Sequence, residues 1–340
     1  MEGTWVFHPQ NIPHAIAALH VRLDTPVPVL NEKYFDGGQC RIYKVDFPDG
    51  ESWAVRIPLH VQNAPRETII GLLQGEMKII QALEVKGFRW APRLQVSSLT
   101  FENSIGYPFI ALSWVSGETL SWSLEHPARP IRDKMLCQTA RIIMSLIECT
   151  REQREPATQY FERIIDSKVG RIRRGVLPEI TLQDCIAQKQ LLSTILRPEL
   201  ENAPYAIAHG DLSCRNIIVD SEYNITGFID WGFAARRPLQ MACSLPRFLC
   251  MEEPILPPPL VLQEDRRIFI ASLQSGPSTL AQQISLALSP DDIDFYQCFL
   301  ESITSKGMHR WLARQGWKLP WKGSTEHAPS AMVEDKKDSR

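Results

Sequence analysis

Alternation of apolar and polar residues dominates the first third of the chain and predicts β-strands. Residues 40–47, CRIYKVDF, alternate between two faces, and a turn at residues 48–50 separates them from residues 52–58, SWAVRIP. Proline, aspartate and glycine in that turn make the two segments a predicted hairpin. Two more strands are expected at residues 91–98, APRLQVSS, and at residues 106–115, GYPFIALSWV.

Apolar residues spaced three and four apart predict helices in other parts of the chain. The segment 66–84 is amphipathic and contains Glu76 within its pattern. Further helical segments are expected within 1–24, where Ile12, Ile16, Leu19 and Val21 are loosely spaced, and at 133–149, 263–287 and 291–314. Within the helical part, residues 206–234 are an interruption, with two short strands, NIIV and ITGFI, joined by a polar turn.

These patterns indicate an α+β chain organised as two lobes. Residues 1–115 are expected to form a small antiparallel-sheet N-lobe with one main helix. Residues 116–324 are expected to form a larger, mainly helical C-lobe, and the polar stretch lies inside it. Residues 325–340 are polar and are predicted to be a disordered tail.

Composition narrows the classes of protein that these lobes could belong to. The chain has 340 residues, is 44% hydrophobic and 22% charged, and carries a formal net charge of -2, which argues against nucleic acid as a partner. Its eight cysteines are scattered without a C-x-x-C pair, which is typical of a reducing compartment. The first residues do not resemble a secretory signal, and no apolar run is long enough for a membrane helix. We therefore expect a cytoplasmic protein that does not bind membranes.

The stretch AIAHGDLSCRNIIVDSEYNITGFIDWGFA, residues 206–234, concentrates the candidate chemistry. It could be a polar loop on an ordinary sheet or a site for a metal and a phosphate. Phosphoryl transfer from ATP requires a carboxylate aimed at the attacking hydroxyl and a metal that neutralises charge on the phosphates. Asp211 is the candidate for the catalytic carboxylate. Asn216 and Asp230 are candidate oxygen ligands for Mg²⁺, held in register by the two short strands.

The motifs HGDLSCRN and FIDW resemble the catalytic loop and metal motif of the aminoglycoside phosphotransferase and choline kinase-like family, in particular its fungal phosphotransferases. The resemblance covers most of the chain, including GGQCRIYKVDFPDGESWAVRIP, GEMKIIQAL and ENSIGYPFIALSWVSGETL. It implies a bilobal protein-kinase-like fold. It also implies an ATP- and Mg²⁺-dependent kinase, with Asp211 as the catalytic base and Asn216 and Asp230 as metal ligands.

The resemblance also implies roles for four residues of the N-lobe. Gly37 and Gly38 would form the turn that covers the phosphates, although a hairpin turn needing positive φ explains them equally well. Glu76 would pair with a basic residue of the following strand, unless it lies on a solvated helix face. That basic residue is Arg56, where Lys is usual, and Arg has a different donor geometry.

Two residues near the catalytic motifs complete the comparison with the family. Gly232 stands where an acidic residue is common in the fungal group, which weakens any second acidic contact beside Asp230. His209 matches a histidine that mainly orients the catalytic loop. The minimal set of a base and metal ligands is intact.

Three functions are compatible with these residues. The first is transfer of the γ-phosphate to a hydroxyl of a small molecule, and the second is a nucleotide-binding module with impaired catalysis. A protein kinase fits least, because no A-P-E element or activation segment follows Asp230. The acceptor stays open: a cationic acceptor would favour an acidic pocket, and the candidates for it are Glu252, Glu253, Asp291, Asp292 and Asp294.

Overall fold

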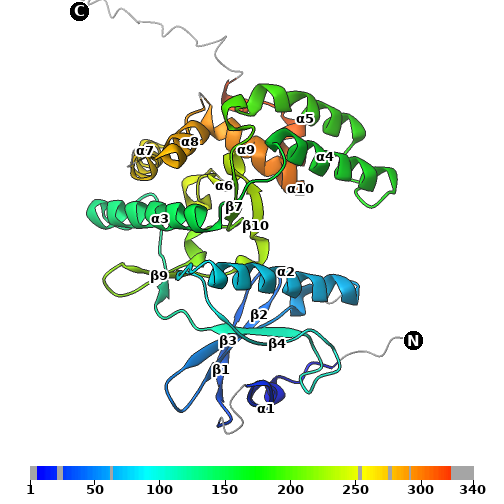
Figure 1. Ribbon diagram of the computed structural model, residues 1–340, viewed down its shortest axis with the longest axis vertical. Coiled ribbons are helices and arrows are strands. Elements are labelled where there is room, and N and C mark those ends of the chain that lie inside the picture. Colours follow the sequence, from blue (N-terminus) through cyan, green and yellow to red (C-terminus); the bar gives the residue numbers. More distant parts are fainter. Residues whose placement is uncertain are drawn as a thin grey trace, which may run out of the picture.

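A computed structural model describes residues 6–20, 26–61, 64–251, 255–274, 278–290 and 292–322 of the chain. The described residues form a smaller lobe built on a sheet and a larger lobe built mainly from helices (Figure 1). The prediction of a bilobal α+β fold is therefore confirmed. Val21, Glu252, Glu253, Asp291 and the predicted tail 325–340 lie outside the described residues.

The smaller lobe contains a five-stranded antiparallel sheet with strand order β1-β2-β3-β5-β4. Its elements are α1 (Ile12–Leu19), β1 (Val29–Asp36), β2 (Arg41–Asp46), β3 (Ser52–Ile57), α2 (Arg66–Val85), β4 (Leu94–Ser98) and β5 (Phe109–Ser113). Helix α2 lies between this sheet and the larger lobe (Figure 1). It contributes Ile69 to the core of the smaller lobe and Leu73 and Ile80 to the core that continues into the larger one.

The predicted hairpin is β2 and β3. The two strands pair in register from Arg41 opposite Ile57 to Asp46 opposite Ser52. The turn between them contains Gly50, whose φ of +91° suits a residue without a Cβ. This hairpin places Arg56 near the end of β3, at the side of the sheet that faces the larger lobe.

The larger lobe surrounds two small pieces of β-structure. Its helices are α3 (Arg129–Thr150), α4 (Ala157–Arg173), α5 (Leu182–Ile195), α6 (Leu239–Ala242), α7 (Leu260–Leu273), α8 (Thr279–Ala287), α9 (Ile293–Thr304) and α10 (Lys306–Arg314). Strands β6 (Glu118–Thr119), β8 (Ile217–Val219) and β9 (Ile225–Phe228) form one antiparallel sheet, and β7 (Tyr205–Ala208) pairs with β10 (Ala235–Pro238). None of the described helices combines the length and the apolar character needed to cross a membrane.

Serine caps divide the two long helical segments that were predicted near the C-terminus. The Ser278 side chain accepts a hydrogen bond from the backbone N–H of Ala281 and begins α8. The Ser305 side chain accepts one from Met308 and begins α10 directly after α9 has ended. A serine oxygen at this position satisfies an N–H that has no partner within the helix, so it starts a new helix where apolar spacing alone suggests continuity.

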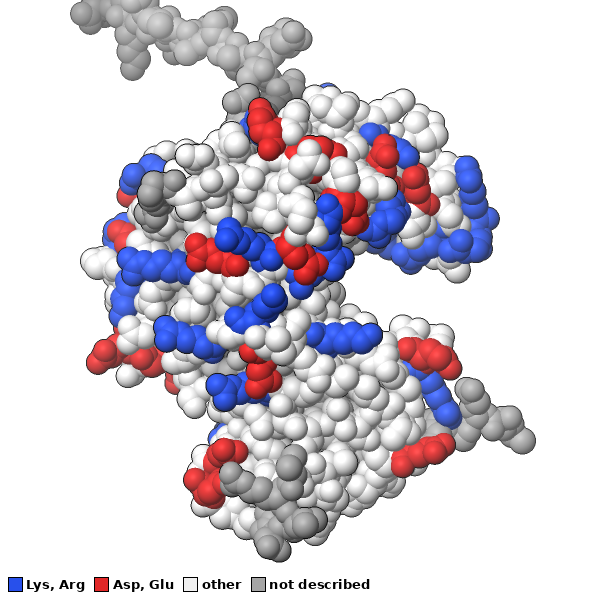
Figure 2. Space-filling view, in the orientation of Figure 1, with Lys and Arg blue, Asp and Glu red and all other residues white. Residues whose placement is uncertain are grey.

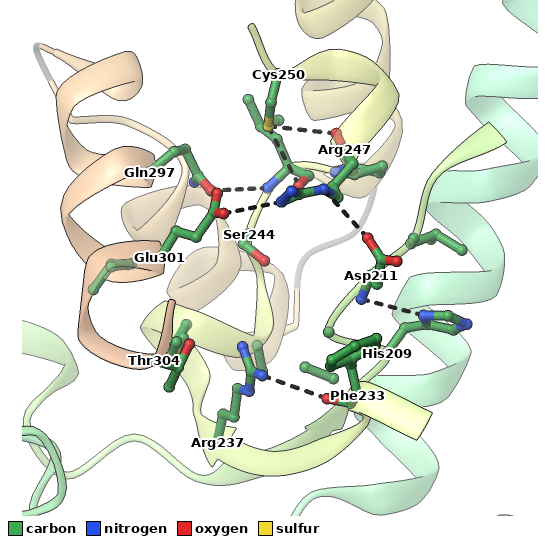
Figure 3. Close-up of a pocket in the computed structure, with 18 of the residues that line it drawn as sticks. His209, Asp211, Phe233, Arg237, Ser244, Arg247, Cys250, Gln297, Glu301 and Thr304 are labelled. Carbon is green, nitrogen blue, oxygen red and sulfur yellow. Dashed lines mark hydrogen bonds and ion pairs between the residues drawn. The ribbon is translucent and has the colours of Figure 1, made fainter. Parts of the chain in front are cut away.

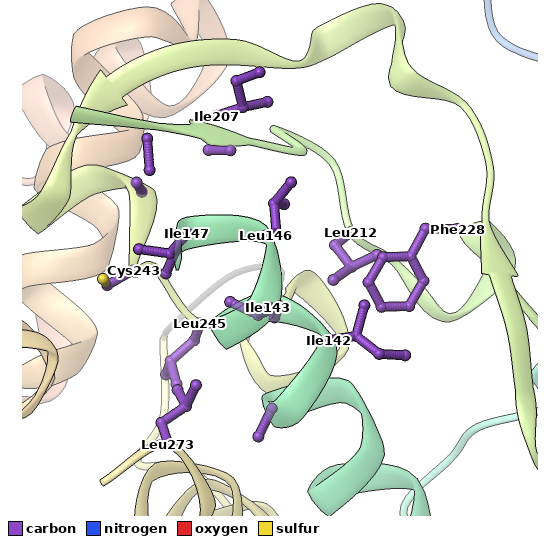
Figure 4. Close-up of a cluster of buried hydrophobic side chains, with 14 of the residues drawn as sticks. Ile142, Ile143, Leu146, Ile147, Ile207, Leu212, Phe228, Cys243, Leu245 and Leu273 are labelled. Atoms are coloured by element: carbon purple, nitrogen blue, oxygen red, sulfur yellow. The ribbon is translucent and has the colours of Figure 1, made fainter. Parts of the chain in front are cut away.

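A buried cluster beneath the polar stretch holds it in place (Figure 4). Four side chains of α3, those of Ile142, Ile143, Leu146 and Ile147, pack toward Ile207, Leu212 and Phe228. These last three residues belong to β7, to the loop that follows it and to β9. Burial of this apolar surface therefore positions the loop 209–216 against a rigid helix.

Candidate active site

The hairpin formed by β8 and β9 brings the two candidate metal ligands to the same end of a sheet. Ile217 pairs with Phe228, so Asn216 immediately precedes one strand and Asp230 follows the other by two residues. The backbone N–H of Ile229 donates to the carbonyl oxygen of Asn216 at 2.9 Å. Asp230 has φ of +64°, a left-handed conformation that Asp tolerates better than most residues.

His209 connects the backbone of Asp211 to the backbone of the segment before Asp230. It is buried, and its Nε2 lies 2.9 Å from the carbonyl oxygen of Ile229, which can only accept a hydrogen bond. Nδ1 is therefore the acceptor for the backbone N–H of Asp211, at 3.4 Å. Burial lowers the pKa of His209 to about 4, so the ring is neutral near pH 7. These contacts agree with an orienting role for His209.

Asp211 is held at its backbone and left partly open at its carboxylate. The Asn216 side chain donates through Nδ2 to the carbonyl oxygen of Asp211 at 2.7 Å. The Arg247 Nε lies 3.2 Å from Oδ1 of Asp211, and the Asp211 side chain is 34% exposed. Burial raises the pKa of Asp211, the charge of Arg247 lowers it, and the charge of Asp230 raises it.

Arg56 joins the sheet of the smaller lobe to the candidate metal site. Its Nε lies 3.2 Å from Oε2 of Glu76, and its Nη2 donates to Oδ1 of Asp230 at 2.8 Å. Glu76 is only 3% exposed, so its alternative placement on a solvated helix face is wrong. Burial raises the pKa of Glu76, and the charge of Arg56 acts against that rise. Glu76 therefore pairs with the strand arginine as the resemblance implied, and the same arginine also reaches Asp230.

The glycine pair lies in the connection between β1 and β2. The backbone N–H of Gly37 donates to the carbonyl oxygen of Cys40 at 2.9 Å, and neither Gly37 nor Gly38 has a positive φ. A need for positive φ therefore does not explain these glycines. The charges of Arg56, Glu76 and Asp230 all influence the thiol of Cys40, whose pKa burial raises to about 11. The connection thus ends beside Arg56, Glu76 and Asp230, and phosphate binding by the two glycines stays a prediction.

The oxygen ligands of Asn216 and Asp230 suit Mg²⁺, which prefers a few hard oxygens and completes its shell with water and phosphate. Arg56 contacts only Oδ1 of Asp230. The described part of the chain has no group of three or more His, Cys, Asp or Glu side chains that could hold a metal by itself. The donor set therefore fits a metal that shares its coordination with a nucleotide, and it does not fit a closed structural site.

A cavity of about 420 Å³ opens in the larger lobe beside Asp211 and is called here the Asp211 cavity. Figure 3 shows Arg247 between Asp211 and Glu301, with Arg237, Ser244 and Thr304 facing the same space. Sequence reasoning missed all of these side chains except Asp211. The sequence offered no local signal for them, because arginine, serine and threonine side chains are mostly exposed and only the tertiary structure turns these toward a cavity.

The predicted acidic pocket is only partly present in the Asp211 cavity. Asp294 lines the cavity, but its Oδ1 pairs with Nη2 of Arg266 at 2.8 Å. Asp292 caps α9, since its side chain accepts from the backbone N–H of Phe295. Neither carboxylate is therefore available as an unpaired partner for a cationic acceptor.

Gly210 provides a test of how tightly the loop 209–216 is packed. Its φ is +83°, and a Cβ at this position would lie 2.1 Å from the carbonyl oxygen of Phe233. We expect Gly210→Ala to lower the free energy of unfolding by more than about 1 kcal/mol, measured by urea denaturation. As a matched control, Gly71→Ala in the exposed face of α2 meets no atom within 4 Å and should raise it by about 0.5–1 kcal/mol. Equal effects of the two substitutions would contradict this description of the loop.

The chain is similar to known phosphotransferases in sequence and in fold. The family model described as the phosphotransferase enzyme family matches residues 16–240. One structure with a similar fold is a putative aminoglycoside phosphotransferase from Ralstonia eutropha, 13% identical with a TM-score of 0.52, covering 91% of this chain and 99% of that one. A streptomycin–ATP–APH(2")-IIa ternary complex is 13% identical with a TM-score of 0.53, covering 86% of this chain and 93% of that one.

Two further relatives extend the comparison. The GDP complex of a mutant aminoglycoside 2'-phosphotransferase-IIIa is 16% identical with a TM-score of 0.52, covering 93% of this chain and 95% of that one. Among curated proteins, clavilactone A biosynthesis cluster protein Y of Ampulloclitocybe clavipes is 24% identical over 137 residues. That match covers 39% of this chain and spans 31% of the relative's length.

Proposed function

The chain belongs to the phosphotransferase enzyme family, and on that premise we propose that it transfers the γ-phosphate of ATP to a hydroxyl group of a small molecule, using Mg²⁺. The observation that carries the proposal is the position of Asp211. Its side chain lines the cavity, and it is close enough to Asp230 for that charge to raise its pKa. ATP and GDP occur in the names of two structures of similar fold, and we extend nucleotide use to this chain as part of the proposal.

In the proposed reaction, a hydroxyl of the acceptor lies in the Asp211 cavity with its proton directed at the Asp211 carboxylate. The hydroxyl oxygen forms a bond to the γ-phosphorus as the bond from that phosphorus to the bridging oxygen breaks, and ADP leaves. The proton passes to Asp211. Asn216 and Asp230 would hold Mg²⁺, which when bound neutralises charge on the phosphates.

The smaller lobe supplies the proposed grip on the nucleotide. Arg56 carries a fixed positive charge, and Glu76 limits its movement through the 3.2 Å ion pair. Gly37 and Gly38 would let the backbone of the β1–β2 connection approach the phosphates closely.

We keep residues 1–115 as the nucleotide-binding lobe and residues 116–324 as the lobe with the catalytic loop and acceptor site. We place the protein in the cytoplasm, in keeping with its eight free cysteines.

One observation favours the alternative of a nucleotide-binding module with impaired catalysis. Arg56 donates to Oδ1 of Asp230 and so competes for an oxygen that the metal would use.

No such observation favours a protein kinase. Stoichiometric phosphorylation of a folded protein at one site, without a small acceptor, would be needed to support that function.

The proposal is tested by measuring ADP release from Mg·ATP over a panel of small hydroxyl compounds, with Asp211→Asn as the matched inactive control. We expect turnover in the parent protein that depends on both the acceptor and Mg²⁺, and none above background in the variant. Tight binding of Mg·ATP with no turnover for any acceptor would support the impaired module instead.

The pH dependence of the reaction should reveal the influence of Arg247 on Asp211. A catalytic base must be deprotonated, and Arg247 opposes the rise in the pKa of Asp211 that burial causes. Arg247→Ala should therefore raise that pKa and move the acidic limb of the kcat/KM profile to higher pH. Arg247→Lys retains the charge and should shift the limb less.

A matched control for Arg247 is Lys189→Ala, which removes an exposed ion pair with Asp166 far from the catalytic loop. Its profile should overlay that of the parent protein. A shift of the acidic limb to lower pH in Arg247→Ala would contradict the assignment of Asp211 as the base.

A further inference from the structure

Arg237 enters the Asp211 cavity from β10 without an acidic partner. In the described part of the chain no carboxylate lies within ion-pair distance of its guanidinium, whereas the two other arginines of the cavity, Arg247 and Arg266, are both paired. Among the described residues, the one hydrogen bond of the Arg237 side chain is long, at 3.5 Å from Nη2 to the carbonyl oxygen of Phe233. The Nε of Arg237 is buried without an acceptor. Burial lowers the pKa of Arg237, and the charges of Tyr160 and of Glu301, which lines the same cavity, act against that shift.

The fold keeps Arg237 and Asp211 on adjoining walls of the cavity. Strand β10 pairs with β7, so Arg237 lies opposite Ala206, five residues before Asp211. Phe233 connects the two walls, because its carbonyl oxygen contacts Arg237 and also packs against Gly210. A molecule that fills the cavity with its hydroxyl directed at Asp211 can therefore place another of its groups at Arg237. Ser244 and Thr304 face the same space and add hydroxyl donors (Figure 3).

A second cavity, of about 410 Å³, adjoins the first and shares Thr304 and Ser305 with it. All the charged residues that line it are basic, namely Arg163, Lys168, Arg171 and Lys306. Figure 2 shows Lys and Arg side chains gathered over the end of α4, above the hollow between the two lobes. Arg163 and Lys306 also form ion pairs with Glu155 and Glu179, so the basic character is partly compensated at its edge. The second cavity nevertheless favours an anion over a cation where it adjoins the first, at Thr304 and Ser305.

We propose, resting on the phosphotransferase function above, that the acceptor is an anionic hydroxyl compound whose carboxylate or phosphate group pairs with Arg237 while its hydroxyl faces Asp211. Guanidinium groups recognise both kinds of oxyanion through paired N–H donors. The opposite charge is disfavoured, because a cation in this cavity would meet Arg237 and would find Asp294 already paired with Arg266 and Glu301 already paired with Arg247. The acceptor class thus differs in charge from the cationic aminoglycosides that appear in the names of structures with a similar fold.

The experiment compares acceptors that share one hydroxyl framework and differ only in charge: hydroxy acids, their amides, the corresponding amino alcohols and the phosphate monoesters of diols. Turnover is followed as ADP release, and binding to the Asp211→Asn variant is measured by calorimetry. We expect the anionic members to bind about 10- to 100-fold more tightly than their amides. The carboxylate and phosphate arms show which oxyanion is used. Preference for amides or amino alcohols, or the absence of anion-dependent binding across the series, would overturn the inference.

Variants then connect the charge preference to Arg237. Arg237→Met should raise KM for an anionic acceptor about 10- to 100-fold and leave KM for its amide near that of the parent protein, while Arg237→Lys should recover part of the loss. Arg236→Met is the matched control, because this neighbouring arginine binds Glu152 and the carbonyl of Thr150 instead of lining the cavity. Equal losses for acid and amide would contradict the role of Arg237. Turnover of neutral or cationic acceptors alone would refute this inference and leave the proposed function intact. If no acceptor supported the release of ADP from ATP, this result would count against the proposed function. The binding measurements would still decide whether the cavity prefers an anion.

Discussion

Replacing Asp211 by asparagine is expected to lower kcat by about 100- to 10,000-fold, the contribution typical of a general base. The substitution keeps the size of the side chain and removes its capacity to take the hydroxyl proton. The loop should keep its place, because Asn216 and His209 hold it through backbone atoms of residue 211. The lost contact with Arg247 is at a half-exposed pair and should change the unfolding temperature little. The measurement is single-turnover kinetics with an identified acceptor.

The matched comparison for this prediction is Asp230→Ala. Asp230 is proposed as a metal ligand, so its removal should weaken binding of Mg·ATP, whereas Asp211→Asn should bind it about as well as the parent protein. Calorimetric titration of both variants with Mg·ATP separates the two roles. If Asp211→Asn lost nucleotide binding as severely as Asp230→Ala, the assignment of base and ligand would be wrong.

The features that could be predicted from the sequence depend on contacts between nearby residues. The β2–β3 hairpin follows from its turn, and helix α2 follows from apolar spacing over twenty residues. The proximity of Asn216 to Asp230 follows from a short hairpin, because its strands leave only one register for a few apolar residues. Local patterns of this kind need no knowledge of the tertiary structure.

The features that escaped prediction depend on contacts between distant segments. Arg56 and Asp230 are separated by 174 positions, and their hydrogen bond arises because the two lobes meet at α2. Arg247 reaches both Asp211 and Glu301, which come from the catalytic loop and from α9. No local pattern reports that a surface-like arginine will line a cavity. The side chains that line the Asp211 cavity could therefore not be predicted from the sequence.

Arg56→Met should lower kcat/KM for ATP by about 10- to 100-fold. A charge-assisted hydrogen bond to phosphate is worth about 1.5–3 kcal/mol, and each 1.4 kcal/mol corresponds to a factor of ten in rate. Arg56→Lys supplies the same charge through a single point donor and should recover part of the activity. The measurement is steady-state kinetics with ATP as the varied substrate.

Arg56→Met should also destabilise the fold, and this second effect must be separated from the first. Removal of Arg56 leaves the Glu76 carboxylate buried without its partner, at a typical cost of about 3–5 kcal/mol. Burial raises the pKa of Glu76, so the folded variant holds a proton that the unfolded chain releases more readily. The loss of stability should therefore be small at low pH and grow as pH rises above the unfolded pKa of Glu76. Urea denaturation at several pH values measures it.

The double variant Arg56→Met, Glu76→Met distinguishes a structural arginine from one that binds phosphate. Two apolar side chains replace a buried ion pair, so the double variant should regain most of the stability that Arg56→Met loses, and its unfolding should no longer depend on the charge of residue 76. Its kcat/KM for ATP should stay as low as that of Arg56→Met, since no positive charge faces the phosphates. Recovery of activity together with stability would mean that Arg56 serves only to neutralise Glu76. The proposed nucleotide binding would then depend on the glycine pair and the metal alone. The contact of Arg56 with Asp230 would be dispensable, so Arg56 would no longer favour a module with impaired catalysis.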